Sequence, residues 1–216
     1  MTMKLNAQEL RVVADRQVEQ AMGLKRHPVY LVLENVYDTY NVGGLFRLAD
    51  ALAVEKIYLC GEMEIPPNPK IKKASIGTYK IVPWEYKHTA KEAIEELRSM
   101  SFLRKQESSS RSRIESGMTN KIQIIAIEQS EKAVEYTKTD YSFPIAFIVG
   151  NETSGVLPDT LALVDQIVEI PMWGINKSLN VIVSAAIVTY WAMSHEPEVG
   201  IEPTVFPPWR DVLPLK

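Results

Sequence analysis

The chain of 216 residues contains a single cysteine, Cys60, and only three histidines. One cysteine excludes an internal disulfide and a cysteine-cluster metal site, and its position at the end of an apolar run predicts a reduced, buried thiol. His27, His88 and His195 have no metal-ligand spacing, so we expect no metal site. The sequence also lacks Gly-x-Gly-x-x-Gly and Gly-Lys-Ser/Thr turns, which argues against a dinucleotide-dependent dehydrogenase and against a nucleoside triphosphate site.

Long apolar runs are also missing. No stretch approaches the roughly 18 to 20 apolar residues that a membrane span needs, and residues 1–10 show no basic-then-apolar leader. We therefore expect a cytoplasmic protein without a membrane partner. The 24 Lys and Arg residues against 27 Asp and Glu give a net charge of -3, so the molecule has no overall basic field. A polyanion partner would have to bind a local patch.

The hydrophobic pattern alternates between strand-like and helix-like segments. This alternation predicts an α/β fold with a mostly parallel sheet and helices on both faces, over residues 29–194. Residues 1–28 are expected to form an N-terminal helical extension. The predicted strands cover residues 29–34, 56–60, 122–127, 145–149 and 167–170. The predicted helices cover residues 6–22, 43–54, 89–100, 158–164 and 178–194.

Two segments depart from this rhythm. Residues 101–121 contain six serines and five Lys or Arg against two Glu, which predicts an inserted, flexible, locally basic loop. Either the insertion has no function or it contacts RNA. Residues 195–216 hold five of the 13 prolines and are expected to pack as an extended tail.

Polar residues cluster after three of the predicted strands. The first cluster, Asn-x-Gly-x-x-x-Arg, runs from Asn41 to Arg47, and the second, Gly-Asn-Glu-x-x-Gly, begins at Gly150. The third, Ile-Pro-Met-x-Gly-x-x-x-Ser-Leu-Asn-Val, begins at Ile170, and Ser178 within it is predicted to cap the last helix. Taken singly these are ordinary surface, turn and capping residues. Together, at the ends of parallel strands, they predict one shared site.

The combination and order of these motifs closely resemble those of the SpoU (TrmH-like) RNA 2′-O-methyltransferases of the SPOUT superfamily. The resemblance covers residues 29–191 and includes Lys-Ala-Ser-Ile-Gly at residues 73–77. It implies an α/β fold with a deep trefoil knot near the C-terminus. It also implies S-adenosylmethionine as methyl donor, transfer to a ribose 2′-hydroxyl of RNA, no metal, and a homodimer that joins the knot regions of two chains.

The resemblance also assigns residues to roles. The catalytic positions fall on Asn41, Arg47, Glu152, Ser178 and Asn180. The positions that hold the donor, mostly through backbone groups, fall on Ile127, Glu128, Gly150, Ile170, Met172, Ser178 and Leu179. Two positions depart from the pattern, because Ile182 replaces a small polar residue and Trp173 is bulky for its loop.

A ribose hydroxyl must lose its proton as it attacks the methyl group, so the site has to position and polarise it. An arginine is essentially always protonated, so we expect Arg47 to stabilise charge and position phosphate rather than act as a base. Asn41 and Asn180 would orient Arg47 and the ribose, Ser178 would contact donor or ribose, and Glu152 would fix the loops. Because the donor loses its positive charge in the transition state, a largely uncharged cleft is expected.

The substrate class stays open between tRNA and rRNA. The segment before residue 29 is too short for the additional RNA-binding domain of some rRNA-modifying relatives, which favours tRNA. The sequence does not identify the nucleotide. The alternative is a knotted RNA-binding protein without methyltransferase activity.

Overall fold

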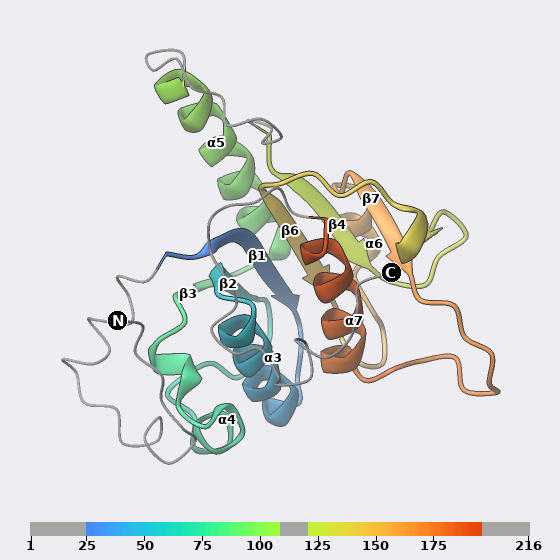
Figure 1. Ribbon diagram of the computed structural model, residues 1–216. Helices are drawn as coiled ribbons and strands as arrows, with labels where there is room; N and C mark the ends of the chain where they lie inside the picture. Colours follow the sequence, from blue (N-terminus) through green and yellow to red (C-terminus); the bar gives the residue numbers. More distant parts are fainter. Residues whose placement is uncertain (1–24, 109–120, 196–216) are drawn as a thin grey trace, which may run out of the picture.

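A seven-stranded sheet forms the centre of the computed structural model, which describes residues 25–108 and 121–195 (Figure 1). The strand order is β3-β2-β1-β6-β4-β7-β5, and every pairing is parallel. The predicted parallel α/β architecture is therefore confirmed. The strands are β1 (His27–Glu34), β2 (Val54–Cys60), β3 (Trp84–Lys87), β4 (Gln123–Ile127), β5 (Val134–Glu135), β6 (Ile145–Val149) and β7 (Gln166–Glu169).

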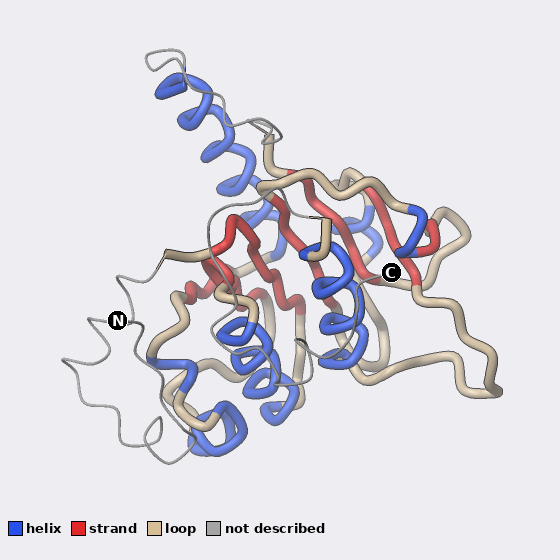
Figure 2. The backbone as a smooth tube through the Cα atoms, viewed as in Figure 1, coloured by secondary structure: helices blue, strands red, loops and turns tan. Residues whose placement is uncertain are grey.

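Helices cover both faces of this sheet, as Figure 2 shows in outline. Side chains alternate between the two faces along each strand. In β1, Leu31 and Leu33 pack with α3 and α7, whereas Tyr30 and Val32 pack with α5. The helices are α3 (Thr39–Ala51), α4 (Pro69–Ser75), α5 (Ala90–Ser108), α6 (Pro158–Leu161) and α7 (Val181–Met193), with 3-10 turns η1 (Thr78–Lys80) and η2 (Tyr136–Lys138).

Three predicted segments lie wholly or partly outside the described residues. These are the N-terminal helix at 6–22, most of the tail from 196 onward, and residues 109–120 of the predicted insertion. The first part of that insertion differs from the prediction, because α5 continues to Ser108 instead of ending near Met100. The physical reason is local propensity: Leu, Arg, Lys, Gln and Glu in this stretch all favour a helix, whereas the prediction gave more weight to serine and charge.

Two elements near the first motif were not predicted. Helix α4 begins after Asn68, whose side chain accepts a hydrogen bond from the backbone of Lys70, and Pro69 occupies its first turn. This asparagine-proline pair is a helix start signal that the sequence analysis did not use. Strand β3 extends the sheet beyond β2. Helix α4 matters for the site because it packs directly against α3.

Candidate functional site

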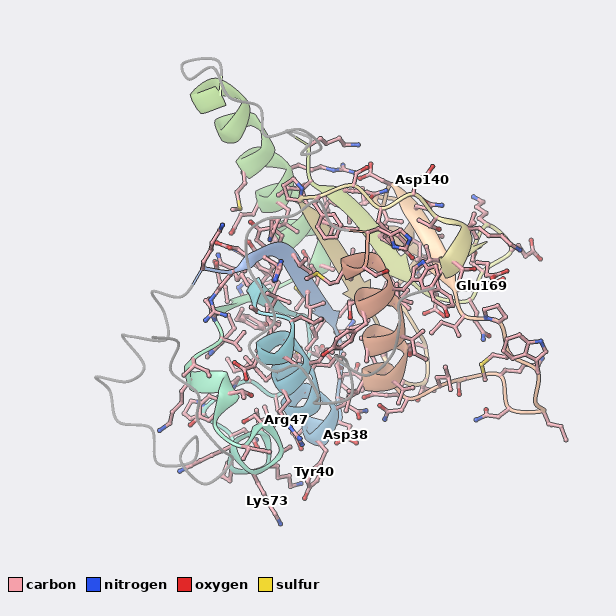
Figure 3. The ribbon with its side chains drawn as sticks, viewed as in Figure 1. Asp38, Tyr40, Arg47, Lys73, Asp140 and Glu169 are labelled. Atoms are coloured by element: carbon pink, nitrogen blue, oxygen red, sulfur yellow. The ribbon has the colours of Figure 1, made fainter. Side chains whose placement is uncertain are left out.

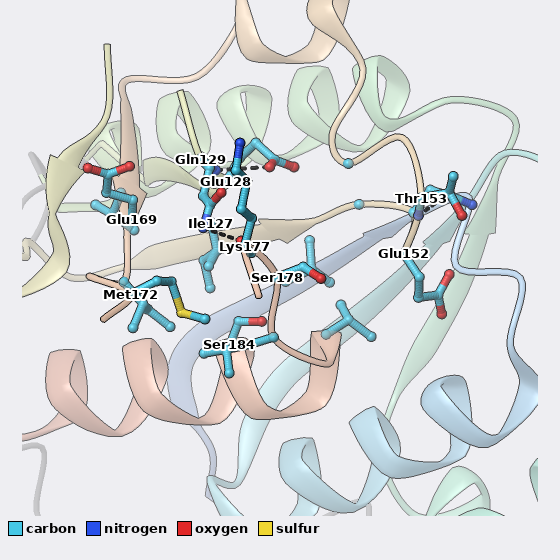
Figure 4. A pocket seen from close by; sticks show the side chains of 18 residues that line it. Ile127, Glu128, Gln129, Glu152, Thr153, Glu169, Met172, Lys177, Ser178 and Ser184 are labelled. Atoms are coloured by element: carbon cyan, nitrogen blue, oxygen red, sulfur yellow. Dashed lines mark hydrogen bonds between the residues drawn. The ribbon is translucent and has the colours of Figure 1, made fainter. Parts of the chain in front are cut away.

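A pocket of about 190 Å³ lies where strands β4, β6 and β7 end and helix α7 begins (Figure 4). Figure 4 shows Glu169 and Met172 at one end of the pocket, Glu152 at the other, and Ser178 and Ser184 between them. The structure brings all seven predicted donor-contacting residues to its walls, although they come from three separate segments. These are Ile127, Glu128, Gly150, Ile170, Met172, Ser178 and Leu179.

The loop after β6 is shaped by two glycines that no other residue could replace without strain. A Cβ on Gly150 would lie 2.2 Å from the backbone carbon of Gly155. Gly155 itself has a φ of 69°, which L side chains rarely adopt. Asn151 pairs with Gly155 through two backbone hydrogen bonds, and its side-chain oxygen accepts from the backbones of Thr153 and Ser154. The result is a tight turn that presents Glu152 toward the pocket.

Two carboxylates brace this turn from neighbouring strands. One oxygen of Glu128 accepts a hydrogen bond from the backbone of Val156 at 2.8 Å. The buried carboxylate of Glu34, at the end of β1, accepts from the backbone of Leu157 and from the hydroxyl of Thr160. Glu34 was not predicted as a site residue. Its only signal in the sequence is that it is a single carboxylate at the end of an apolar strand. The Glu128 side chain thus serves the loop, while its backbone N–H donates to the carbonyl of Val168 in β7 at 3.0 Å.

The three motifs meet in a chain of side-chain hydrogen bonds. Asn180 donates to the side-chain oxygen of Asn41 at 2.9 Å, and Asn41 donates to a carboxylate oxygen of Glu152 at 2.7 Å. Asn41 is only 6% exposed, whereas Glu152 and Asn180 are exposed, so the chain is shielded from water only at its centre. One residue from each motif therefore fixes the others in place, and the prediction that they share one site gains direct geometric support.

The predicted helix cap at Ser178 is wrong. Helix α7 begins at Val181, and Asn180 caps it by accepting a hydrogen bond from the backbone of Ile182. Asparagine and serine are about equally good caps, so spacing alone could not choose between them. The pairing of Asn180 with Asn41 decides the matter by fixing where the helix starts. Ser178 instead lies exposed at the pocket wall, where its hydroxyl is not committed to a helix end.

Arg47 stands apart from the pocket. Its side chain is exposed on α3 and does not line the cavity, and Asn41 and Asn180 bond to each other and to Glu152 rather than orienting it as predicted. Helical geometry explains the difference, because six residues rotate a side chain by about 240° around the axis relative to the first. In Figure 3, Arg47 appears with Tyr40 and Lys73 in one part of the molecule, and Glu169 of the pocket in another.

The paired glycines of the first motif serve helix packing. A Cβ on Gly43 would lie 2.4 Å from the Cβ of Ala74 on α4, and one on Gly44 would lie 2.3 Å from Ile182 on α7. Helix α3 therefore lies close against both neighbours. The second contact also explains why a bulky Ile182 is tolerated where a small residue was expected, because Gly44 leaves room for it.

The third-motif loop contains two fully displayed apolar side chains. Trp173 is 92% exposed and Ile175 is exposed over its whole surface, while Met172 beside them lines the pocket.

The expectation of an uncharged cleft is not met, since four charged residues line the pocket: Glu128, Glu152, Glu169 and Lys177. Glu128 and Glu152 are nonetheless held by hydrogen bonds, so their charge is partly dispersed.

Cys60 is free and buried at the end of β2, as predicted, and burial raises the pKa of its thiol. Across residues 25–108 and 121–195 no group of three or more His, Cys, Asp or Glu is arranged to hold a metal ion. Within the same ranges no helix is long and apolar enough to cross a membrane.

The pocket lies at the carboxyl ends of parallel strands, between glycine turns and the start of a helix. Such a pocket is typical of α/β proteins that bind a small organic ligand. The sequence model of the SpoU rRNA methylase family matches residues 28–115 and 101–190. The chain belongs to this family, as the motif resemblance predicted.

Named relatives agree with this assignment. The chain is 27% identical over 181 residues to a tRNA (guanosine(18)-2′-O)-methyltransferase of Escherichia coli, spanning 82% of this chain and 68% of that protein. It is 28% identical over 189 residues to the protein of the same name from Thermus thermophilus, spanning 86% and 84%.

Solved structures show the same fold. The Aquifex aeolicus TrmH/SpoU tRNA modifying enzyme matches with a TM-score of 0.64 and 23% identity over 88% of this chain and 87% of that one. The SpoU methyltransferase AviRb of Streptomyces viridochromogenes, solved in complex with AdoMet, matches with a TM-score of 0.64 and 20% identity. The match covers 82% of this chain and 63% of AviRb.

Proposed function

We propose that this protein is an S-adenosylmethionine-dependent RNA methyltransferase that transfers a methyl group to a ribose 2′-hydroxyl, with tRNA favoured over rRNA. The observation that carries the proposal is that the second and third motifs line one pocket, and that hydrogen bonds from Asn180 through Asn41 to Glu152 tie the first motif to them. Relatives named as tRNA guanosine-2′-O-methyltransferases match over most of the chain, and a relative named as a 23S rRNA methyltransferase also matches.

The residues present fit the donor. Apolar walls from Ile127, Ile170 and Leu179 suit an adenine ring, and the backbone groups beside Glu128 and Gly150 can read its edge. The carboxylates of Glu152 and Glu169 suit the positively charged end of the molecule. When bound, S-adenosylmethionine supplies an electrophilic methyl group on a sulfonium.

The chain's own groups would prepare the attacking hydroxyl. Asn41 and Asn180 hold Glu152 in one orientation, and Ser178 offers an uncommitted hydroxyl at the pocket wall. Arg47 is permanently charged and exposed, so it suits the role of stabilising the attacking oxygen and a nearby phosphate. No side chain in this set needs a metal ion to act.

A homodimer and a trefoil knot belong to the proposal. Helix α7 displays Val183, Tyr190 and Trp191 as exposed apolar side chains, which a second chain would cover. A dimer would also explain how Arg47, which lies outside the pocket, takes part in the reaction. Light scattering of the pure protein should give twice the 24.4 kDa chain mass, and a single-chain mass at micromolar concentration contradicts the dimer. An experimental structure that traces residues 145–195 tests the knot.

The decisive experiment measures transfer of labelled methyl from S-adenosylmethionine to unmodified tRNA transcripts and to rRNA fragments. Nuclease digestion should then release a 2′-O-methylated nucleoside, and the same yield is expected with and without a chelator. Binding of RNA and donor without any transfer would favour the non-catalytic alternative. Because these RNAs are cytoplasmic, we place the activity in the cytoplasm.

A further inference from the structure

Helix α4 carries three lysines in seven residues, and their ammonium groups have no acidic partner within residues 25–108 and 121–195. Lys70, Lys72 and Lys73 are all exposed, and among the described residues none makes an ion pair or a side-chain hydrogen bond. Elsewhere many exposed lysines are paired: Lys91 lies near Glu95 and Lys121 bonds Asp165. In a protein with a net charge of -3, such a local excess of positive charge requires an explanation.

The packing of α4 against α3 brings two of these lysines to the side where Arg47 lies. The contact between the helices is centred on Gly43 and Ala74. Arg47 follows Gly43 by four residues and Lys70 precedes Ala74 by four, so both lie about one turn from the contact, at its exposed edge. Lys73 is three residues from Lys70 and shares its face.

Lys72 projects from the other side of the helix. Relative to Ala74 it is rotated by about 160°, because each residue turns an α-helix by about 100°. This residue has the same chemistry, the same helix and the same exposure as its neighbours, but its position on the helix is nearly opposite Ala74. It therefore provides a matched control.

Two nearby carboxylates, Asp38 and Glu64, form no ion pair with these cations and bond to neutral donors instead. Asp38 accepts a hydrogen bond from the backbone of Tyr40 at the start of α3, and Glu64 accepts one from the side chain of Asn68. The exposed ring of Tyr40 lies on the same face of α3 as Arg47, seven residues earlier. Cations beside an exposed aromatic ring suit a nucleic acid chain, because phosphates meet the charges and an unpaired base can stack.

We infer that Arg47, Lys70 and Lys73 form a basic patch on α3 and α4 that binds the sugar-phosphate backbone of the substrate RNA. This inference rests on the proposed function and extends it, because it says where the RNA lies. The patch joins the pocket through α3, whose first turn holds Asn41 bonded to Glu152. RNA bound across α3 and α4 would thus pass Arg47 as it approaches the donor site. The alternative is that Lys72 and Lys73 only stabilise the C-terminus of α4 through its dipole.

The test compares Lys70→Ala/Lys73→Ala with Lys72→Ala in the full chain. The probe is an unmodified tRNA transcript, and binding is measured by anisotropy at several salt concentrations. For the double variant we expect about a tenfold loss of affinity per lysine near 0.1 M salt, and a salt slope reduced by about 1 per lysine. Lys72→Ala should stay within twofold of the parent. Affinity for S-adenosylmethionine should be unchanged in all three proteins.

A second variant, Lys70→Arg/Lys73→Arg, keeps the charge and should keep both affinity and slope. Urea unfolding shows whether each variant is folded. If the double alanine variant binds like the parent, or if Lys72→Ala loses as much affinity, the patch is wrong while the proposed function stands. If the parent neither binds nor methylates any RNA, the proposed function fails and the patch with it.

Discussion

The pocket and the outer face of α3 and α4 differ in how firmly their polar groups are held. At the pocket wall, Glu152 is hydrogen-bonded to Asn41 and through it to Asn180, and Glu128 is bonded to the loop it supports. On the outer face, Arg47 and Lys73 have no partner among the described residues. A preformed pocket suits a small ligand with one shape, whereas unpaired flexible cations suit a large polyanion that orders them on binding. Donor binding and RNA binding should therefore respond to different substitutions.

The largest expected effect comes from removing Arg47. Arg47→Ala should slow single-turnover methyl transfer by about 10²-fold or more, because in the proposed mechanism it removes the positive charge that stabilises the attacking oxygen. Its affinity for S-adenosylmethionine should be nearly unchanged, since Arg47 does not line the pocket. Arg47→Lys should restore little, because an ammonium lacks the planar fork of a guanidinium. If the alanine variant is active, or if it has lost donor binding, the pocket and the outer face do not have the separate roles described above.

A smaller effect is expected from Gly155, which tests how firmly the pocket is preformed. Gly155→Ala should lower the free energy of unfolding by about 2 kcal/mol, because the new Cβ strains a positive φ and displaces Glu128 from the backbone of Val156. Donor affinity should fall with it. Gly174→Ala is the matched control, since a Cβ there meets nothing within 4 Å. Calorimetry gives the donor affinity of both variants, and urea unfolding gives their stability. Equal values for the two variants would contradict the view that Glu128 braces the loop after β6.

A double-mutant cycle measures the coupling between motifs. Asn41→Ala should cost about 1 to 3 kcal/mol of stability, because Glu152 and Asn180 each lose a partly buried partner. Asn41→Ala and Glu152→Ala combined should show a coupling of about 1 kcal/mol in urea unfolding. Additive effects would mean that the motifs are neighbours without being linked.

The smallest effect concerns Cys60, whose thiol reports on the core between the sheet and α5, on the face opposite α3 and α7. Burial raises its pKa in the folded state, so this thiol stabilises the fold below its unfolded pKa of about 8.5, and that contribution is lost as the pH rises above it. At pH 8 the native protein should resist a thiol reagent and react fully in urea. Lys70→Ala should leave the labelling rate unchanged, whereas Gly155→Ala should raise it. Rapid labelling of the native parent would show that the core opens locally.

Several features could be predicted because they depend on neighbours in sequence. The apolar runs at residues 29–34 and 145–149 form β1 and β6. The glycines at 150 and 155 shape the turn that follows β6 at the pocket. The motif order was enough to predict that residues of the second and third motifs line one pocket, since parallel strands bring their carboxyl ends to the same edge, but it did not predict that Arg47 lies apart. The extension of α5 was missed because composition was given more weight than helix propensity.

The sequence by itself determined the alternation of strands and helices, the family, and the residues that surround the pocket. These follow from local periodicity and from motif spacing, which act over a few residues at a time. Only the tertiary structure decided that Asn180 rather than Ser178 caps α7, that Asn41 bonds Glu152 and not Arg47, and that α4 packs against α3 at Gly43. Each of these depends on a contact between segments far apart in sequence, where side-chain direction and close packing settle which of several acceptable partners is reached.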